Sequence, residues 1–285
     1  MKQLWDNLSY SNINLTDMFF IDKNYSENHA HMLHKHKGVL ELLYIADGEG
    51  RYIVGNRNYA VRAGDLVICN ADTLHGEAPF QKHNIQTYCC AMENVSIDYL
   101  AKGRIIAQEK KPVLTLEKFN SLVGELMINL YTLHKEKDNK LICNQMATTL
   151  LLLVCKIIST HDKQNKFIVE QKNENMIRKL TNYLDANYKQ DVSLDKISAV
   201  MHISVSHISH LFKRETGLSP MQYVIHRRIG EAQSLLAETN LPIKEIEEKL
   251  GFGSSCHLTA MFKKYVGLSP REYRKYFMNT DKKST

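Results

Sequence analysis

Residues 211–223 read LFKRETGLSPMQY, and residues 261–273 read MFKKYVGLSPREY. The two stretches are 50 residues apart and agree at seven of 13 positions, including the tetrapeptide GLSP. Upstream, residues 193–197 (SLDKI) align with residues 242–246 (PIKEI) at a spacing of 49. Self-similarity at a fixed spacing indicates a repeated structural unit. Because the spacing grows from 49 to 50, the second copy holds one extra residue between its two parts.

Each copy has the pattern of two short helices joined by a turn. In the first copy Ser193 suits a helix N-cap, and a second helix is predicted from about Val205 to Glu215, ending at Gly217. In the second copy the turn falls at residues 251–253 (GFG). Two helices around a three- or four-residue turn form the helix-turn-helix unit that binds DNA. Helical hairpins also build domains that do not bind DNA, and the repeat favours the DNA-binding alternative.

The charge of the chain is distributed unevenly. Residues 175–285 contain 17 Lys and Arg against 11 Asp and Glu, which accounts for the whole net charge of +6. The preceding residues 1–174 contain 20 of each sign and are neutral. This asymmetry is typical of a nucleic-acid-binding module joined to a neutral domain, although a solvated basic surface would look the same.

The six cysteines show no zinc-binding spacing, and the N-terminus has no apolar signal segment. The longest apolar stretch, residues 147–158 (ATTLLLLVCKII), is too short to span a bilayer. We therefore expect a cytoplasmic protein without a membrane partner.

Residues 193–277 resemble the C-terminal domain of the AraC/XylS family of bacterial transcription regulators. The segments that carry the resemblance are LFKRETGLSPMQYVIHRRIGEAQSLLAETNLPIKEIEEKLGF and MFKKYVGLSPREYRKYF. The resemblance implies an all-α DNA-binding domain at residues 176–285, with a helix at about 220–238 joining two helix-turn-helix units. It also implies that the second helix of each unit enters successive major grooves of double-stranded DNA. RNA polymerase is a further partner that the family suggests.

The same resemblance implies which residues should face DNA. They are Ser206, His207, Ser209, His210 and Lys213 in the first unit, and Ser255, Cys256, His257, Thr259, Ala260 and Lys263 in the second. Hydroxyl and imidazole groups can hydrogen-bond base edges, and lysine can pair with phosphate. The family often has arginine where His210 and Ala260 stand. We therefore expect weaker base readout by the second unit, or reliance on thymine methyl groups and DNA shape.

The N-terminal half has a different periodicity. Residues 33–80 read as short strands with turns at 47–50 (DGEG), 55–56 (GN) and 64–65 (GD). This spacing predicts a small β-barrel or jelly roll.

Four residues in this half carry metal-ligand chemistry: His34, His36, Glu41 and His75. The first three stand in a stretch (HKHKGVLELLYIADG) similar to the first cupin motif, and residues 64–75 resemble the second motif in Gly and His only. The resemblance implies a cupin-like sensor domain at residues 1–110. In cupin enzymes the equivalent residues bind a divalent metal, and three imidazoles with a carboxylate suit Fe, Mn, Ni or Zn.

Three roles for these four residues stay open. They could bind a small-molecule effector, for which a carbohydrate is one candidate, they could bind a metal, or they could only brace the barrel. Apart from that metal, the sequence predicts no cofactor.

Between the two halves the period becomes helical. Two apolar stripes, at residues 119–133 and 141–157, flank a polar break at 134–140 (HKEKDNK). Such a helical pair at residues 111–160 packs as core or forms a homodimer contact, which the family resemblance favours. A polar linker is predicted at 161–175.

The predicted fold class is α+β multidomain: a cupin-like barrel, a helical pair and an all-α domain with two helix-turn-helix units. The predicted function is a dimeric, effector-controlled transcription regulator, with activation the commoner outcome in the family, and not an enzyme. Two alternatives remain: a metal-dependent cupin enzyme fused to a DNA-binding module, and a ligand-independent regulator with a structural barrel.

Overall fold

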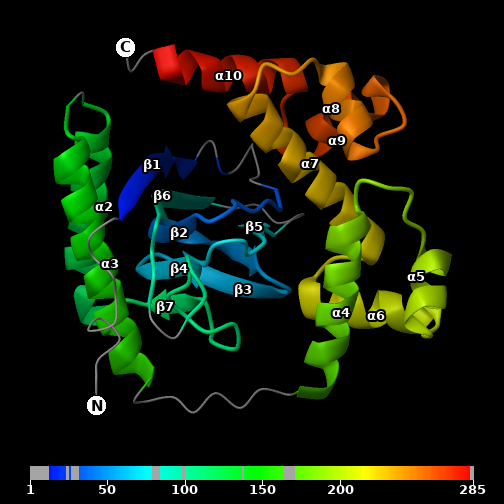
Figure 1. Cartoon of the computed structure of the whole chain (residues 1–285), viewed down its shortest axis with the longest axis horizontal. Helices are drawn as coiled ribbons and strands as arrows, with labels where there is room; N and C mark the ends of the chain where they lie inside the picture. The colour runs from blue at the N-terminus through cyan, green and yellow to red at the C-terminus, as the bar shows by residue number, and fades with distance from the viewer. Residues whose placement is uncertain are drawn as a thin grey trace.

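The computed structural model describes residues 13–23, 26, 32–78, 84–97, 100–136, 138–162 and 171–282. An antiparallel sheet lies between a pair of helices on one side and the helices of the C-terminal half on the other (Figure 1). Most of the predicted linker, and the first residues of the predicted sensor domain, lie outside the described residues.

The sheet forms the N-terminal half, as predicted. Its pairs are antiparallel, in the order β1-β6-β2-β4-β7, and β3 and β5 also pair with the long strand β2. The strands are β1 Asn14–Ile21, β2 Leu40–Val54, β3 Arg57–Arg62, β4 Asp65–Cys69, β5 His75–Glu77, β6 Asn84–Glu93 and β7 Val113–Thr115.

The predicted turn at residues 47–50 is wrong. Strand β2 continues through these residues, and its pairing with β6 shifts register between Ile45 and Asp47. Gly48 has a φ of +81°, and a Cβ there would lie 1.5 Å from the carbonyl oxygen of Asn84. The glycine therefore allows a close approach of two strands, next to the register shift. Glycine is favoured at such a position as well as in a turn.

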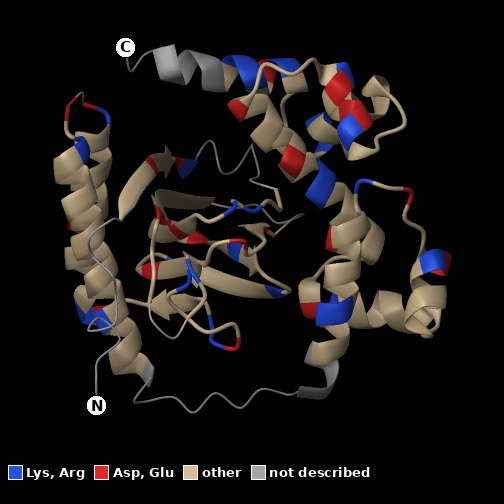
Figure 2. Ribbon diagram, viewed as in Figure 1, with Lys and Arg blue, Asp and Glu red and all other residues tan. Residues whose placement is uncertain are grey.

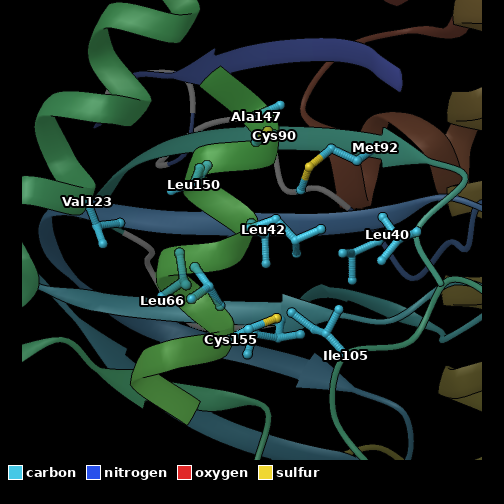
Figure 3. Packing of buried hydrophobic residues seen from close by; sticks show 14 of the residues in the cluster. Leu40, Leu42, Leu66, Cys90, Met92, Ile105, Val123, Ala147, Leu150 and Cys155 are labelled. Carbon is cyan, nitrogen blue, oxygen red and sulfur yellow. The ribbon is translucent and has the colours of Figure 1, made fainter. Parts of the chain in front are cut away.

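Two helices, α2 (Asn120–His134) and α3 (Lys140–Asp162), cover one face of the sheet. Side chains alternate along β2, so that Leu40 and Leu42 face these helices and join one hydrophobic cluster with Leu150 of α3. Figure 3 shows this packing, with Val123 of α2 beside it. Glu41 and its neighbours at alternate positions face the other side of the sheet.

Helix α3 is long and apolar enough to cross a membrane by length and composition alone, so the sequence-based argument from the shorter stretch 147–158 does not hold for the whole helix. Its inner face belongs to the core of the N-terminal half, because Ala147, Leu150 and Val154 are fully buried there. The start of the predicted apolar stripe does not join this core, since Leu141 is 74% exposed and Ile142 is 51% exposed.

The C-terminal half is helical, as predicted. Its helices are α4 Gln171–Asn187, α5 Leu194–Met201, α6 Val205–Thr216, α7 Pro220–Glu238, α8 Ile243–Leu250, α9 Ser255–Val266 and α10 Pro270–Lys282. Helices α5 and α6 form the first helix-turn-helix unit, and α8 and α9 form the second. The extra residue of the second copy lies in its turn, which spans residues 251–254 where the first copy uses 202–204.

Local sequence signals set the ends of these helices. Ser193 accepts a hydrogen bond from the backbone N–H of Lys196, and Ser204 accepts one from that of His207. Gly217 ends α6 with a φ of +81°, as predicted. Ser219 and Gln222 form a reciprocal capping box at the start of α7.

Each helix-turn-helix unit has its own hydrophobic cluster, and α7 contributes to both. Tyr223 and Val224 belong to the first cluster, whereas Ile229, Ala232 and Leu236 belong to the second. Helix α7 therefore determines how the two units sit relative to one another.

Candidate functional site

The outer face of α6 is open to solvent where the sequence predicts contacts with DNA. Ser206, His207, His210 and Lys213 are exposed and Ser209 is half-buried, while Ile208, Leu211 and Phe212 pack inward. The structure thus places all five predicted side chains away from the core.

The corresponding face of α9 follows the same pattern. Cys256, His257, Ala260 and Lys263 are exposed, and Ser255 and Thr259 are half-buried. The hydroxyl of Ser255 donates a hydrogen bond to Glu247 Oε2 at 2.8 Å, so this group is already engaged within its own unit.

Two further basic residues lie on these helices. Arg214 of α6 and Lys264 of α9 are exposed. They stand 50 residues apart, as do Lys213 and Lys263. The sequence analysis did not single them out, although the repeat spacing would have found them. Lys and Arg also occur on α10 (Figure 2).

The guanidinium of Arg228, on α7, holds the two units together. Its three nitrogens donate to the carbonyl oxygens of Tyr188 at 2.6 Å, Gln190 at 2.7 Å and Gly251 at 2.6 Å. The first two carbonyls follow α4, and the third ends α8. A Cβ at Gly251 would lie 2.3 Å from the carbonyl of Lys189, so the two chain segments are in direct contact.

A second cluster lies in the sheet domain, where His34, His36, Glu41 and His75 come together. Each residue offers one nitrogen or oxygen atom as a ligand, and these four atoms all lie within 4.8 Å of one another. Glu41 Oε2 is 2.6 Å from His75 Nε2, and its other oxygen is 3.6 Å from His36 Nε2. We call this set the four-residue site; the sequence analysis predicted all four members.

Backbone carbonyls orient two of the imidazoles. His34 Nδ1 lies 2.7 Å from the carbonyl oxygen of Met32, and His75 Nδ1 lies 2.9 Å from that of Thr73. Because a carbonyl only accepts, each Nδ1 carries the proton and each Nε2 is directed to the site. This arrangement presets both rings as ligands.

The charges within the site are strongly coupled. Burial alone would raise the pKa of Glu41, but the surrounding imidazoles, His75 above all, outweigh it and hold that pKa well below its usual value. Burial alone would lower the pKa of His75, and the ion pair with Glu41 reverses the shift. For His34, burial and then His75 lower the pKa, so this ring is neutral at pH 7.

These residues fit a divalent transition metal. Three imidazole nitrogens and one ionised carboxylate converge, two rings are held by outer hydrogen bonds, and Glu41 is only 5% exposed. A buried thiol also borders the site, with Cys89 Sγ 3.8 Å from Glu41 Oε1, which the sequence analysis missed. Burial raises the pKa of this thiol well above its usual value.

A separate open cavity of about 440 Å³ lies between the start of β1 and the turn that joins α2 to α3. It is lined by Asn14, His134 and Asn144, among others. The four-residue site does not line it, so this cavity does not correspond to the predicted effector site.

Comparison with known proteins agrees with both halves of this structure. A family model described as a helix-turn-helix domain matches residues 197–276, and a cupin domain model matches residues 24–78. The "Uncharacterized HTH-type transcriptional regulator YdiP" of Escherichia coli K12 is 28% identical over 253 residues, covering 86% of this chain and 82% of its own. The chain is an AraC-type transcription regulator. It binds DNA and carries a cupin-like N-terminal domain.

Other relatives of this AraC-type regulator match it over similar lengths. The "HTH-type transcriptional activator RhaR" of Escherichia coli O139:H28 is 24% identical over 218 residues, covering 75% of this chain and 77% of its own. Among solved structures, the C-terminal domain of AraT, a response regulator from Geobacillus stearothermophilus, is 29% identical. It covers 37% of this chain and 88% of its own, with a TM-score of 0.36.

Proposed function

We propose that this AraC-type regulator is controlled by a small effector bound at the four-residue site. The observation that carries the proposal is the convergence of His34, His36, Glu41 and His75 within 4.8 Å. One partner would offset the cost of burying the carboxylate of Glu41, yet three imidazoles surround it, and clusters of groups with strongly shifted pKa values concentrate at functional sites. A purely structural brace would need only the pair between Glu41 and His75.

A thermal-shift screen with sugars, aromatic acids and divalent metals tests this proposal. A compound present at 100 times its Kd should raise the free energy of unfolding by about 2.7 kcal/mol. The His36→Ala variant is the matched control, because His36 is half-buried and belongs to the site without joining the Glu41–His75 pair. If no compound in the panel produces a thermal shift that is lost in His36→Ala, the result would favour the structural brace.

A divalent metal is the second candidate for this site, favoured by the donor set of three nitrogens and one oxygen. Protein purified without chelator should then contain one equivalent of metal, and His36→Ala should lose it. Metal bound equally by the variant would place that metal elsewhere in the chain.

We propose that the chain is not an enzyme. The relatives it matches are transcription regulators, and the DNA-binding half gives the site a sensing role. The competing proposal, a metal-dependent enzyme, predicts turnover by the metal-loaded protein. We expect such a regulator to act in the cytoplasm and to contact RNA polymerase at the promoters it binds. We also expect it to activate transcription.

We propose that α6 and α9 read DNA with the residues predicted from the sequence. Their polar side chains are exposed on the faces opposite each buried stripe. Hydroxyl and imidazole groups would contact base edges, while Lys213 and Lys263 would contact phosphate. Footprinting on a bound fragment should show protection over two successive major grooves; protection of a single groove would contradict this placement.

We propose that α2 and α3 form a homodimer contact. Four large apolar side chains on them are exposed: Leu122, Ile128, Leu141 and Ile142. Single exposed apolar residues are ordinary, but a group on two adjacent helices is typical of an interface. The double variant Leu141→Ser, Ile142→Ser should sediment as a monomer at concentrations where the parent is a dimer. Parent protein that is monomeric throughout would contradict the proposal.

A further inference from the structure

Residues Met32 and Leu33, which immediately precede the four-residue site, lie directly on helix α7. A Cβ at Gly230 would be 2.1 Å from the carbonyl oxygen of Leu33 and 3.2 Å from the carbonyl carbon of Met32. Glycine inside a helix costs about 1 kcal/mol relative to alanine. The contact explains its presence, because any side chain at this position would push the segment off the helix.

Hydrogen bonds fix this segment, which we call the latch segment (Met32–Leu33), to one face of α7. The N–H of Met32 donates to Gln233 Oε1 at 3.0 Å, and the carbonyl of Leu33 accepts from Arg227 Nη1 at 2.9 Å. Arg227, Gly230 and Gln233 recur every three residues, so they lie on the same side of the helix.

The side chains of the latch segment enter the cores of both helix-turn-helix units. Met32 is 1% exposed and belongs to the hydrophobic cluster of the second unit. Leu33 is fully buried and belongs to that of the first unit, together with Ile53 and Leu74 of the sheet domain. These two residues therefore contact the unit on each side of α7.

The same segment orients the four-residue site. The carbonyl of Met32 accepts from His34 Nδ1 at 2.7 Å. His34 and His75 also exchange two backbone hydrogen bonds of 2.9 Å. A shift of the peptide between Met32 and Leu33 would therefore move the ring of His34 and its partner His75. The site and α7 are joined through two residues of backbone.

We propose that the latch segment transmits the occupancy of the four-residue site to α7 and so changes the affinity of the two helix-turn-helix units for DNA. This proposal rests on the proposed effector site and adds the route of its regulation. Ligand binding at His34 and His75 fixes the segment that α7 contacts, and DNA binding fixes the units that α7 joins. Linkage between two such sites is reciprocal and amounts to 5- to 150-fold in typical proteins.

A mutant cycle tests the route without any ligand. The full-length parent, Gly230→Ala, His34→Ala and the double variant are titrated against a DNA fragment that the parent selects from a random pool. Each single variant should change the Kd for DNA at least fivefold. The double variant should change it no further than the stronger single variant, because both substitutions release the same segment.

The control for the cycle is Ser234→Ala. Ser234 is half-buried on α7, one turn beyond Gly230, and it lies outside the four-residue site. This variant should bind DNA within twofold of the parent. If Gly230→Ala does not fold, Gln233→Met replaces it, since that change removes the acceptor for Met32 N–H. Independent, multiplicative effects of the two positions, or no effect of His34→Ala, would overturn the proposal.

Zinc ion serves as the probe for the site itself. Saturating zinc should change the Kd of the parent for DNA at least fivefold, and His36→Ala should abolish that change. Gly230→Ala should still bind zinc, by calorimetry, yet saturating zinc should change its DNA affinity less than twofold. Zinc that binds the parent at this site without altering DNA affinity would overturn the latch. If zinc and the effector panel both fail to bind, the proposed effector site is wrong, and the mutant cycle still decides the latch.

Discussion

Arg227 and Arg228 are neighbours on α7, but their guanidinium groups tie different parts of the chain together. Arg227 donates to the carbonyl of Leu33 in the sheet domain, while Arg228 donates to the carbonyl of Gly251 at the end of α8. Consecutive helical residues point about 100° apart, so one helix can contact the sensor domain and both DNA-binding units at once.

Arg228 should control the relative placement of the two recognition helices. In Arg228→Lys a single ammonium cannot reach the three carbonyls that the guanidinium satisfies. We expect the free energy of unfolding to fall by about 2 kcal/mol, as two of the three carbonyls lose their partners. Affinity for a DNA site spanning two grooves should fall more than affinity for a half-site. Urea unfolding and fluorescence anisotropy measure the two effects, and equal losses on both DNAs would contradict this role.

Lys213 and Lys263 should contribute affinity without base specificity. Lys213 is exposed on α6, and Lys263 is exposed on α9. Replacing either by alanine should weaken binding to all sequences alike and reduce the slope of log K against log salt by about 1. Titrations at several salt concentrations check this. A slope equal to that of the parent would remove the lysine from the DNA contact.

His210 should influence base preference in one half of the operator. Its ring is exposed on the outer face of α6. Selection from a random DNA pool should give His210→Ala a changed preference within the half-site of the first unit only, with a discrimination change of about 1–3 kcal/mol at one base pair. The matched variant is Ala260→Gly at the equivalent position of α9, which removes only a methyl group. Identical consensus sequences from His210→Ala and the parent would refute base contact by His210.

Gly48 should tolerate no side chain. A Cβ there would lie 1.5 Å from the carbonyl oxygen of Asn84, and the backbone has a φ of +81°. Gly48→Ala should therefore lower the free energy of unfolding by at least about 2 kcal/mol, because β6 must move and the new residue is strained. Gly55→Ala is the control, since its φ is +64° but nothing lies within 4 Å of the added Cβ. Equal losses in the two variants would show that strain alone, and not the close approach, sets the cost.

His226 should make the second unit sensitive to acid. Burial lowers its pKa to about 3. Its ring packs against that of Tyr265, with 4.9 Å between the ring centroids. Because the unfolded chain takes up the proton near pH 6.5 and the folded one does not, stability is full above that pH and falls as pH drops below it. Between pH 7 and pH 5 the loss from this one group should approach roughly 2 kcal/mol. Urea unfolding of the parent and His226→Gln at both pH values should show this excess loss in the parent alone.

Local sequence signals were enough to predict the C-terminal half. Ser193, Gly217 and Pro220 set helix ends through backbone hydrogen bonds and dihedral angles that depend on neighbouring residues only. In the sheet, the same reasoning failed at Gly48, because a turn and a close approach of two strands both favour glycine, and only the position of the distant strand β6 distinguishes them. At Leu141 and Ile142 the sequence left core packing and a homodimer contact open, because apolar character alone does not tell whether the sheet or a second copy covers a side chain.

The sequence by itself determined the repeated unit, through periodicity and spacing. Its resemblance to the AraC/XylS and cupin families indicated the two exposed helix faces and the members of the four-residue site. Only the tertiary structure brought His75 to Glu41 and placed Met32 and Leu33 on α7 beside Gly230. Those relationships join residues up to about 200 positions apart, as the bond from Met32 to Gln233 shows. No local propensity specifies such pairs, because they depend on which surfaces of two separately folded halves exclude water together.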